Sequence, residues 1–145
     1  MTSKDLINTI RNKIKKGILD WNVKSDRRAF VSICPELIVP FADYLFQELK
    51  FRFIIASALQ SKKGFEIYYH FSKDEIGFIL NVHVILPEDK PEIESLANNF
   101  VAANWIEREM HELFGINFLN HPNPDKLISE GNWAEGVYPY RNKEI

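Results

Sequence analysis

Hydrophobic positions recur along the chain at two different spacings, which separate helical from extended segments. A first amphipathic helix is predicted near the N-terminus from apolar residues at helical spacing: Leu6, Ile7, Ile10, Ile14 and Ile18. A second helical segment opens at Pro35, and its apolar face comprises Leu37, Ile38, Phe41, Tyr44, Leu45 and Leu49. The N-terminal part of the chain is therefore expected to contain two helices.

Extended segments are predicted at residues 28–33, 51–59, 64–71 and 76–86, which are rich in β-branched and aromatic residues. The clearest alternation is in 64–71, where Phe65, Ile67, Tyr69 and Phe71 are separated by more polar residues. The segments 61–64 and 72–75 have the composition of hairpin turns. Connections this short join antiparallel strands, so an antiparallel meander is expected.

A third, long helix is predicted to follow the strands. Asp89 is suited to cap it, with Glu92 completing a capping box and Pro91 in the first turn. Gly115 is a natural residue just beyond its end. The fold class is therefore α+β, with N-terminal helices packed on an antiparallel sheet, one long C-terminal helix and an irregular extended tail.

The tail differs in composition from the rest of the chain. Prolines, glycines and isolated aromatic residues dominate residues 117–145, with little apolar material for a core. We expect a single α+β domain at 1–116 and a partner-binding tail at 117–145. The alternative is a tail that packs on the surface of its own domain.

Composition excludes several kinds of function. The chain has 145 residues, enough for one ordinary domain, and its net charge of -2 gives no support to nucleic-acid binding. Cys34 is the only cysteine, and a single thiolate cannot hold an iron–sulfur cluster. The sequence has no apolar run of membrane-spanning length and no signal-peptide pattern at its start. We therefore expect a cytoplasmic protein that reaches a membrane only through partners.

The predicted third helix carries charged residues where its apolar stripe would continue. On a helix, the face with Ile93, Leu96 and Phe100 leads to Glu107 and His111, so one helix meets two environments. Buried charges need partners, and an ion-pair network is expected among Glu107, Arg108, Glu109 and Glu112. Three interpretations remain open at this point: an exposed face with surface ion pairs, an interface helix, or an acid/base pair in an enzyme.

Local motifs for metal or nucleotide chemistry are incomplete. His111-Glu112 would need a second histidine at position 115 to form a zinc-protease motif, and that position is Gly115. No glycine-rich phosphate loop or nucleophile elbow is present. We assign no catalytic, cofactor-binding or metal-binding residue to this chain.

The segment from Asn104 to Ile116, followed by Phe118 and His121-Pro122, resembles the signature of the 30-kilodalton family of respiratory-chain NADH dehydrogenase, its C subunit. Asn-Trp, Glu-Arg-Glu, a further acid, Phe-Gly-Ile and His-Pro recur there at the same spacing. The tail departs from the family pattern directly after Pro122 and again beyond Pro139.

The resemblance implies a non-catalytic structural subunit in the cytoplasmic arm of a membrane-bound redox complex. The short tail and His111 favour the small subunit of Ech-type (group 4) energy-converting nickel–iron hydrogenases, which couple ferredoxin and proton redox chemistry to ion translocation. Its partners would be a large catalytic subunit with the nickel–iron site, a small iron–sulfur subunit and a ferredoxin-like subunit. The C subunit of NADH:quinone oxidoreductase is the alternative. An acid/base enzyme using Glu107 or Glu109 and a free-standing binding module are further hypotheses.

The resemblance also implies a set of partner-interface or structural residues. They are Asn104, Trp105, Glu107, Arg108, Glu109, His111, Glu112, Phe114, Gly115, His121, Pro122, Trp133, Pro139 and Arg141.

Overall fold

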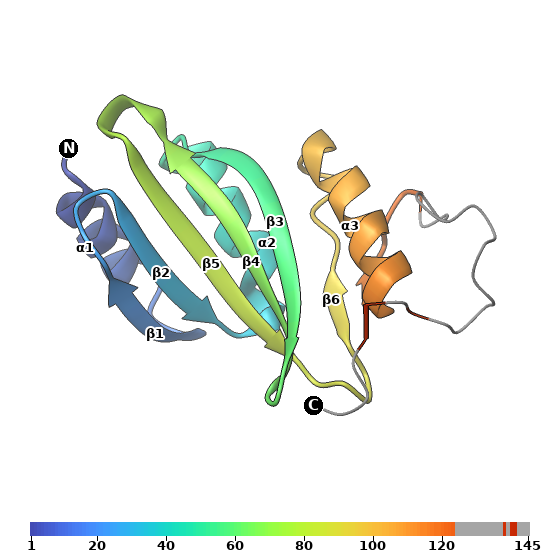
Figure 1. Cartoon of the computed structure of the whole chain (residues 1–145). Helices are drawn as coiled ribbons and strands as arrows, with labels where there is room; N and C mark the ends of the chain where they lie inside the picture. The colour runs from blue at the N-terminus through green and yellow to red at the C-terminus, as the bar shows by residue number, and fades with distance from the viewer. Residues whose placement is uncertain (124–137, 139, 142–145) are drawn as a thin grey trace.

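The computed structural model describes residues 1–123, 138, 140 and 141 (Figure 1). Its helices are α1 (Ser3–Lys13), α2 (Ile38–Asp43), which continues into a π-helical turn at Tyr44–Glu48, and α3 (Val101–Phe114). Its strands are β1 (Ile18–Val23), β2 (Arg28–Ile33), β3 (Arg52–Ser61), β4 (Gly64–Lys73), β5 (Phe78–Leu86), β6 (Glu92–Glu94) and β7 (Asn117–Leu119). The α+β class is confirmed.

The main sheet is mixed, whereas the turn pattern predicted an antiparallel one. Its strand order is β1-β2-β5-β4-β3, and β2 runs parallel to β5 while the other pairs are antiparallel. The hairpins β3–β4 and β4–β5 form as expected. The segment with α2 carries the chain from β2 to the far edge of the sheet, so β5 returns beside β2 in the same direction.

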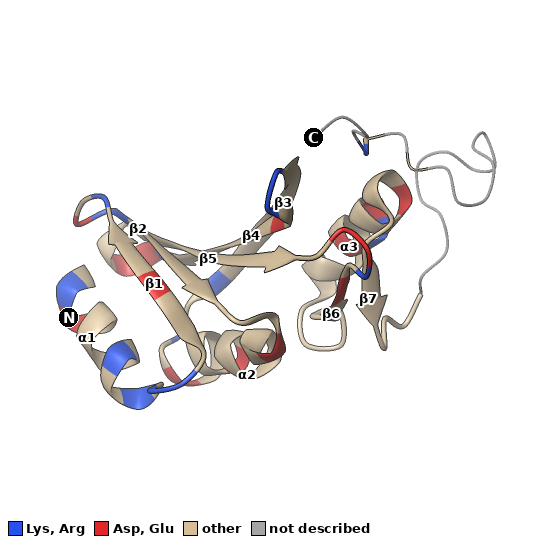
Figure 2. Cartoon of the chain, turned by 90° about the horizontal axis from the view of Figure 1, so that it is seen from below, with Lys and Arg blue, Asp and Glu red and all other residues tan. Residues whose placement is uncertain are grey.

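All three helices pack on the same face of this sheet. Figures 1 and 2 show α1 and α2 together on one side of the strands. The α3 segment joins that face through aromatic contacts, because Phe100 meets Phe71 and Phe114 meets Phe65 at edge-to-face geometry. The alternating residues predicted to be apolar in β4 are all buried: Phe65, Ile67, Tyr69 and Phe71. The core therefore lies between this face and the helices.

The first helix is shorter than its apolar spacing predicted. It begins with a capping box in which Thr2 and Asp5 exchange hydrogen bonds, and it ends at Lys13. Ile18 belongs instead to β1, a strand that sequence reasoning missed. The backbone leaves the helix at Ile14, which is extended, and Gly17, with a φ of +93°, lies in the turn that leads into β1.

The third helix begins at Val101, so the predicted start at Asp89 is wrong. Glu92 lies in β6, whose residue Ile93 pairs with Phe118 of β7 in a parallel two-stranded sheet. The apolar stripe from Ile93 to Phe100 is therefore not helical. Because β7 pairs with β6, the packed structure continues beyond the boundary expected at residue 116. The pairing of β6 with β7, which local sequence cannot reveal, makes this segment extended.

Among the helices of the described residues, none has both the length and the apolar character that crossing a bilayer requires.

Candidate site around Glu107

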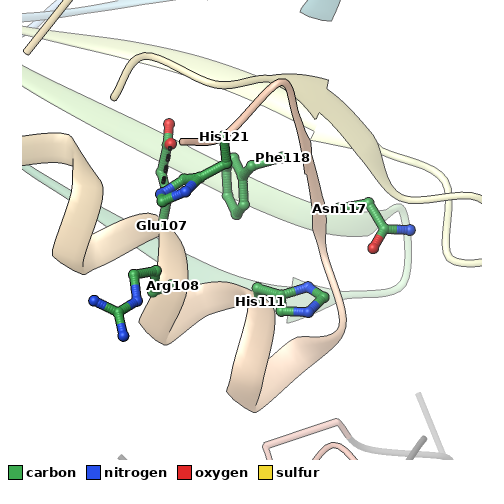
Figure 3. A pocket seen from close by; sticks show the side chains of 6 residues that line it. All are labelled: Glu107, Arg108, His111, Asn117, Phe118 and His121. Atoms are coloured by element: carbon green, nitrogen blue, oxygen red, sulfur yellow. Dashed lines mark ion pairs between the residues drawn. The ribbon is translucent and has the colours of Figure 1, made fainter. Parts of the chain in front are cut away.

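The site forms where α3 crosses the two-stranded sheet of β6 and β7 (Figure 3). The helix ends at Gly115, as predicted, and this residue adopts a left-handed φ of +78° while its N–H donates to the His111 carbonyl. The chain then turns into β7 and returns along the helix. This return places His121 beside Glu107.

Glu107 is completely shielded from solvent, and both of its carboxylate oxygens have donors. The Ser95 hydroxyl donates to Oε1 at 2.5 Å, and the Leu96 N–H donates to Oε2 at 2.8 Å. Ser95 itself is held because its Oγ accepts the Ala97 N–H at 2.9 Å. The carboxylate therefore ties α3 to the loop after β6. The sequence predicted that Glu107 pairs with charged residues of its own helix. Its hydrogen-bond donors are instead the Ser95 hydroxyl and the Leu96 N–H.

His121 is held in one defined tautomer. Its Nε2 lies 3.1 Å from the Asn104 carbonyl, which can only accept, while its Nδ1 accepts the Asn123 N–H at 2.9 Å. The ring is therefore neutral, with its proton on Nε2. The same Nε2 lies 3.8 Å from Oε1 of Glu107, and both side chains are almost fully buried. Pro122, the next residue, is exposed.

A small cavity of about 80 Å³ lies at this junction. Its lining residues are Glu107, Arg108, His111, Asn117, Phe118 and His121. The His111 Nδ1 donates to the Ile116 carbonyl at 3.0 Å, which fixes this ring against the turn after α3. Pockets for organic ligands usually measure about 300 Å³ or more, whereas one water occupies about 30 Å³. The cavity therefore suits water molecules and is too small for a typical metabolite.

Burial dominates the electrostatics of Glu107. It raises the pKa of the carboxyl to about 7, against the hydrogen bonds from Ser95 and Leu96, which lower it. Tyr69 of β4 is also fully buried, and its hydroxyl has no hydrogen-bond partner within the described residues. Burial, and then the nearby Glu107, raise the pKa of Tyr69 well above its usual value.

Three described residues of the tail pack against the C-terminal end of α3. Arg141 donates from Nε and Nη2 to the Phe114 carbonyl at 3.2 and 2.7 Å, and its guanidinium lies 5.0 Å from the ring of Tyr138. The Tyr140 N–H donates to the Leu113 carbonyl at 3.0 Å. These contacts satisfy carbonyl groups that a helix end leaves unpaired. At these residues the tail packs on its own domain.

The side of α3 that faces away from Glu107 exposes apolar surface. Val101 is 88% exposed and Trp105, one turn later, is 64% exposed. The Arg108 guanidinium lies 5.8 Å from the centre of the Trp105 ring. One helix therefore does meet two environments, a polar buried cluster and an exposed aromatic face.

The structure brings together most of the residues expected at the interface or in a structural network. Asn104, Glu107, Arg108, His111 and His121 meet around the cavity, while Glu112 is buried and Glu109 half-buried nearby on α3. Trp133 and Pro139 lie outside the described residues. Sequence reasoning missed Ser95, Tyr69 and Tyr138, because no local pattern connects them to Glu107 or Gly115.

The described residues offer no obvious metal site, since no three His, Cys, Asp or Glu side chains among them gather closely enough to hold an ion. Glu107 could exchange a proton near neutral pH, but its surroundings leave room only for water. The arrangement is better suited to fastening the segments around α3 than to binding a reactant.

Comparison with known proteins agrees with the signature around α3. The model of the family described as respiratory-chain NADH dehydrogenase, 30 Kd subunit, matches residues 31–144. The C subunit of the F(420)H(2) dehydrogenase of Methanosarcina mazei is 28% identical over 139 residues, which cover 90% of this chain and 88% of that protein. The C subunit of the NADH-quinone oxidoreductase of Chelativorans sp. is 29% identical over 133 residues, covering 88% and 66% respectively. The predicted resemblance is confirmed.

Two solved structures share the fold. A trypsin-resistant fragment of Nqo5 superposes with a TM-score of 0.65 at 22% identity, covering 85% of this chain and 99% of the fragment. A chain of the membrane-bound sulfane sulfur reductase, an archaeal respiratory membrane complex, superposes with a TM-score of 0.77 at 23% identity, covering 95% and 82%.

Proposed function

The chain belongs to the respiratory-chain NADH dehydrogenase 30 Kd subunit family, and from that premise we propose that it is a non-catalytic structural subunit of a membrane-bound redox complex. It lies on the cytoplasmic face and reaches the membrane through its partners. Nickel–iron or iron–sulfur centres belong to those partners, a large catalytic subunit and small iron–sulfur and ferredoxin-like subunits. This chain positions them and transfers no electrons itself.

The observation that carries this proposal is that Glu107 is buried and hydrogen-bonded within the domain. A general acid or base must reach a reactant, yet this carboxylate is fully buried and bound by Ser95 and Leu96. The adjoining cavity of about 80 Å³ is too small for a typical substrate. The signature helix therefore uses its acid to hold the domain together and presents Trp105 outward.

Two branches of the family remain candidates for the complex. His111 in the signature segment favours an energy-converting hydrogenase that couples ferredoxin and proton chemistry to ion translocation. The second candidate is a dehydrogenase arm, supported by the relatives named for F(420)H(2) dehydrogenase and NADH-quinone oxidoreductase. Tagging this chain and purifying it from native membranes distinguishes the branches, because the co-purifying large subunit identifies the reaction.

The interface itself is tested with Trp105→Ala in the same purification. A tryptophan at the centre of an interface contributes about 2 kcal/mol or more, which corresponds to a roughly thirtyfold weaker association. Leu19→Ala is the matched control, because Leu19 is 67% exposed on β1, away from α3. We expect the first variant to lose its partners and the second to keep them.

Both variants should keep the stability of the isolated chain within about 0.5 kcal/mol, because both side chains are exposed. A separate variant, Glu107→Gln, addresses the enzyme hypothesis. If this variant assembles normally but the assembled complex loses its turnover, the structural role is wrong. Recovery of the chain alone from membranes would instead favour a free-standing binding module.

A further inference from the structure

The face of the main sheet opposite the helices carries a connected set of polar side chains. In β2 the residues that point to the helices, Ala29 and Val31, are fully buried, whereas Phe30 and Ser32 on the opposite face are half-buried. No described helix covers this opposite face, as Figures 1 and 2 together show. Ser32 is half-buried on this face and reaches solvent, whereas the side chains of His83 and Glu66 are only 12% and 14% exposed.

Ser32, His83 and Glu66 form a hydrogen-bonded relay across three strands of this face. Ser32 of β2 is the register partner of His83 of β5, and its Oγ lies 2.9 Å from Nδ1 of the imidazole. The other ring nitrogen, Nε2, lies 2.7 Å from Oε1 of Glu66 in β4. Tyr68 stacks on the imidazole at a centroid distance of 4.6 Å, which restricts the rotation of the ring.

The direction of each proton in this relay follows from the Glu66 carboxylate. Burial acts to raise its pKa, but hydrogen bonds from Ser61 and His83 outweigh it and lower the pKa below its usual value. Glu66 is therefore ionised and can only accept, so Nε2 of His83 carries the proton. In the neutral imidazole Nδ1 has a lone pair, and the Ser32 hydroxyl donates to it. This is the arrangement of an activated nucleophile, its base and the group that orients the base.

A second relay on the same face provides an internal comparison. Nδ1 of His70 lies 2.5 Å from Oδ1 of Asn81, whose Nδ2 donates to the Ala29 carbonyl at 3.2 Å. The amide is thereby oriented, so Nδ1 of His70 donates to Oδ1. In the neutral ring Nε2, which lies 2.9 Å from the Ser57 Oγ, accepts from that hydroxyl. This relay has a neutral amide in the place of the Glu66 carboxylate. Its serine is the more exposed of the two.

We propose that Ser32 is a base-activated nucleophile and an acylation site that accepts acyl groups from activated esters, with His83 as the general base and Glu66 as its orienting partner. The Ser32 Oγ bonds to the carbonyl carbon while its proton passes to Nδ1 of His83. The bond from that carbon to the ester's leaving group breaks, and the leaving alkoxide or thiolate takes the proton from His83. No oxidant or reductant is needed.

The surroundings of Ser32 limit this chemistry to slow modification. Strand β2 is paired with β1 on one edge and β5 on the other, so its backbone N–H groups are not arranged as an oxyanion hole. Lack of one such donor slows acyl transfer about 100-fold to 1000-fold in serine hydrolases. The product is therefore one acyl group on Ser32 that accumulates, and not a hydrolytic cycle. The inference is independent of the subunit role proposed above.

The experiment treats the purified full chain with p-nitrophenyl acetate and measures acetylation at each serine by peptide mass mapping over time. We expect Ser32 to be acetylated faster than Ser57, and faster than Ser32 in the denatured chain. His83→Gln should slow the reaction at Ser32 about 100-fold, the lower end for loss of a general base. Glu66→Gln keeps an acceptor but removes the charge, so a loss of about tenfold is expected.

Ser57→Ala is the matched control, because it removes the hydroxyl of the second relay and should leave the rate at Ser32 unchanged. Circular dichroism of each variant verifies folding. If His83→Gln fails to fold, Glu66→Gln, which preserves the hydrogen-bond geometry, decides the question. The proposal is overturned if Ser32 in the folded chain is acetylated no faster than Ser32 in the denatured chain. It is also overturned if folded His83→Gln or folded Glu66→Gln is acetylated at Ser32 as fast as the unchanged chain.

Discussion

The Glu107 carboxylate and the His121 imidazole lie 3.8 Å apart with both side chains almost fully buried. Glu107 is in α3, whereas His121 follows β7 and reaches the helix only because β7 pairs with β6. The neutral ring donates to the Asn104 carbonyl, and the carboxyl accepts from Ser95 and Leu96. Loop, helix and returning chain are thereby joined at one buried junction.

Stability should depend on pH through Glu107. Its folded pKa of about 7 lies above the ordinary value of 4.5, so the folded state binds a proton more tightly than the unfolded state. The contribution is fully present below about pH 4.5 and is lost as the pH rises through about 7. We expect the free energy of unfolding to fall by about 2 to 3 kcal/mol from this group between about pH 5 and pH 8. Chemical denaturation at several pH values measures it.

Glu107→Gln provides the control for this pH dependence, because the amide does not titrate but can still accept the Leu96 N–H. The difference between the pH profiles of the unchanged chain and the variant gives the contribution of the Glu107 carboxyl to the pH dependence of stability. A variant profile that fell as steeply as that of the unchanged chain would show that Glu107 is not the titrating group.

Ser95→Ala should destabilise the domain by about 2 kcal/mol, because the buried Oε1 of Glu107 loses its hydroxyl donor. It should also raise the pKa of Glu107 further, since the hydrogen bond from Ser95 lowers that pKa. Urea denaturation measures the first effect and the shifted pH profile the second. Ser25→Ala, at an exposed turn, should change stability by less than about 0.5 kcal/mol.

Gly115→Ala should be more harmful than Gly77→Ala, although both glycines have a positive φ. At Gly77 the added carbon meets open space, so only the backbone strain of about 1 kcal/mol remains. At Gly115 it would lie 2.6 Å from Cε2 of Tyr138 and would displace the tail from the end of α3. Hydrogen exchange at the Tyr140 N–H should therefore accelerate only in Gly115→Ala. Equal unfolding free energies would contradict the Tyr138 contact.

Tyr69→Phe should leave the fold unchanged or stabilise it by up to about 1 kcal/mol. The substitution removes a buried hydroxyl that has no hydrogen-bond partner among the described residues and keeps the ring that fills the core. Thermal unfolding of the two proteins at the same pH measures the difference. A loss of more than about 1 kcal/mol would mean that the hydroxyl is hydrogen-bonded, with water in the adjoining space as the first candidate.

Local patterns determined much of the fold. The alternation in 64–71 predicted the buried face of β4, because a strand on a core must bury every second residue. The turn residues on either side of this segment predicted the two hairpins. Gly115 marked the end of α3 for an equally local reason, its left-handed backbone. The signature from Asn104 to Pro122 also determined the family, since it consists of residue types at consecutive spacings.

Tertiary structure alone decided what depends on distant partners. The parallel pairing of β2 with β5 and of β6 with β7 joins segments far apart in the chain, and it overrode the capping signals at Asp89. In the sequence, Glu107 is one of several charged residues on a predicted helix, and nothing local distinguishes it from the others. Its burial and its bonds to Ser95 arise only where three segments meet, because desolvation and hydrogen bonding depend on position in space and not on neighbours in sequence.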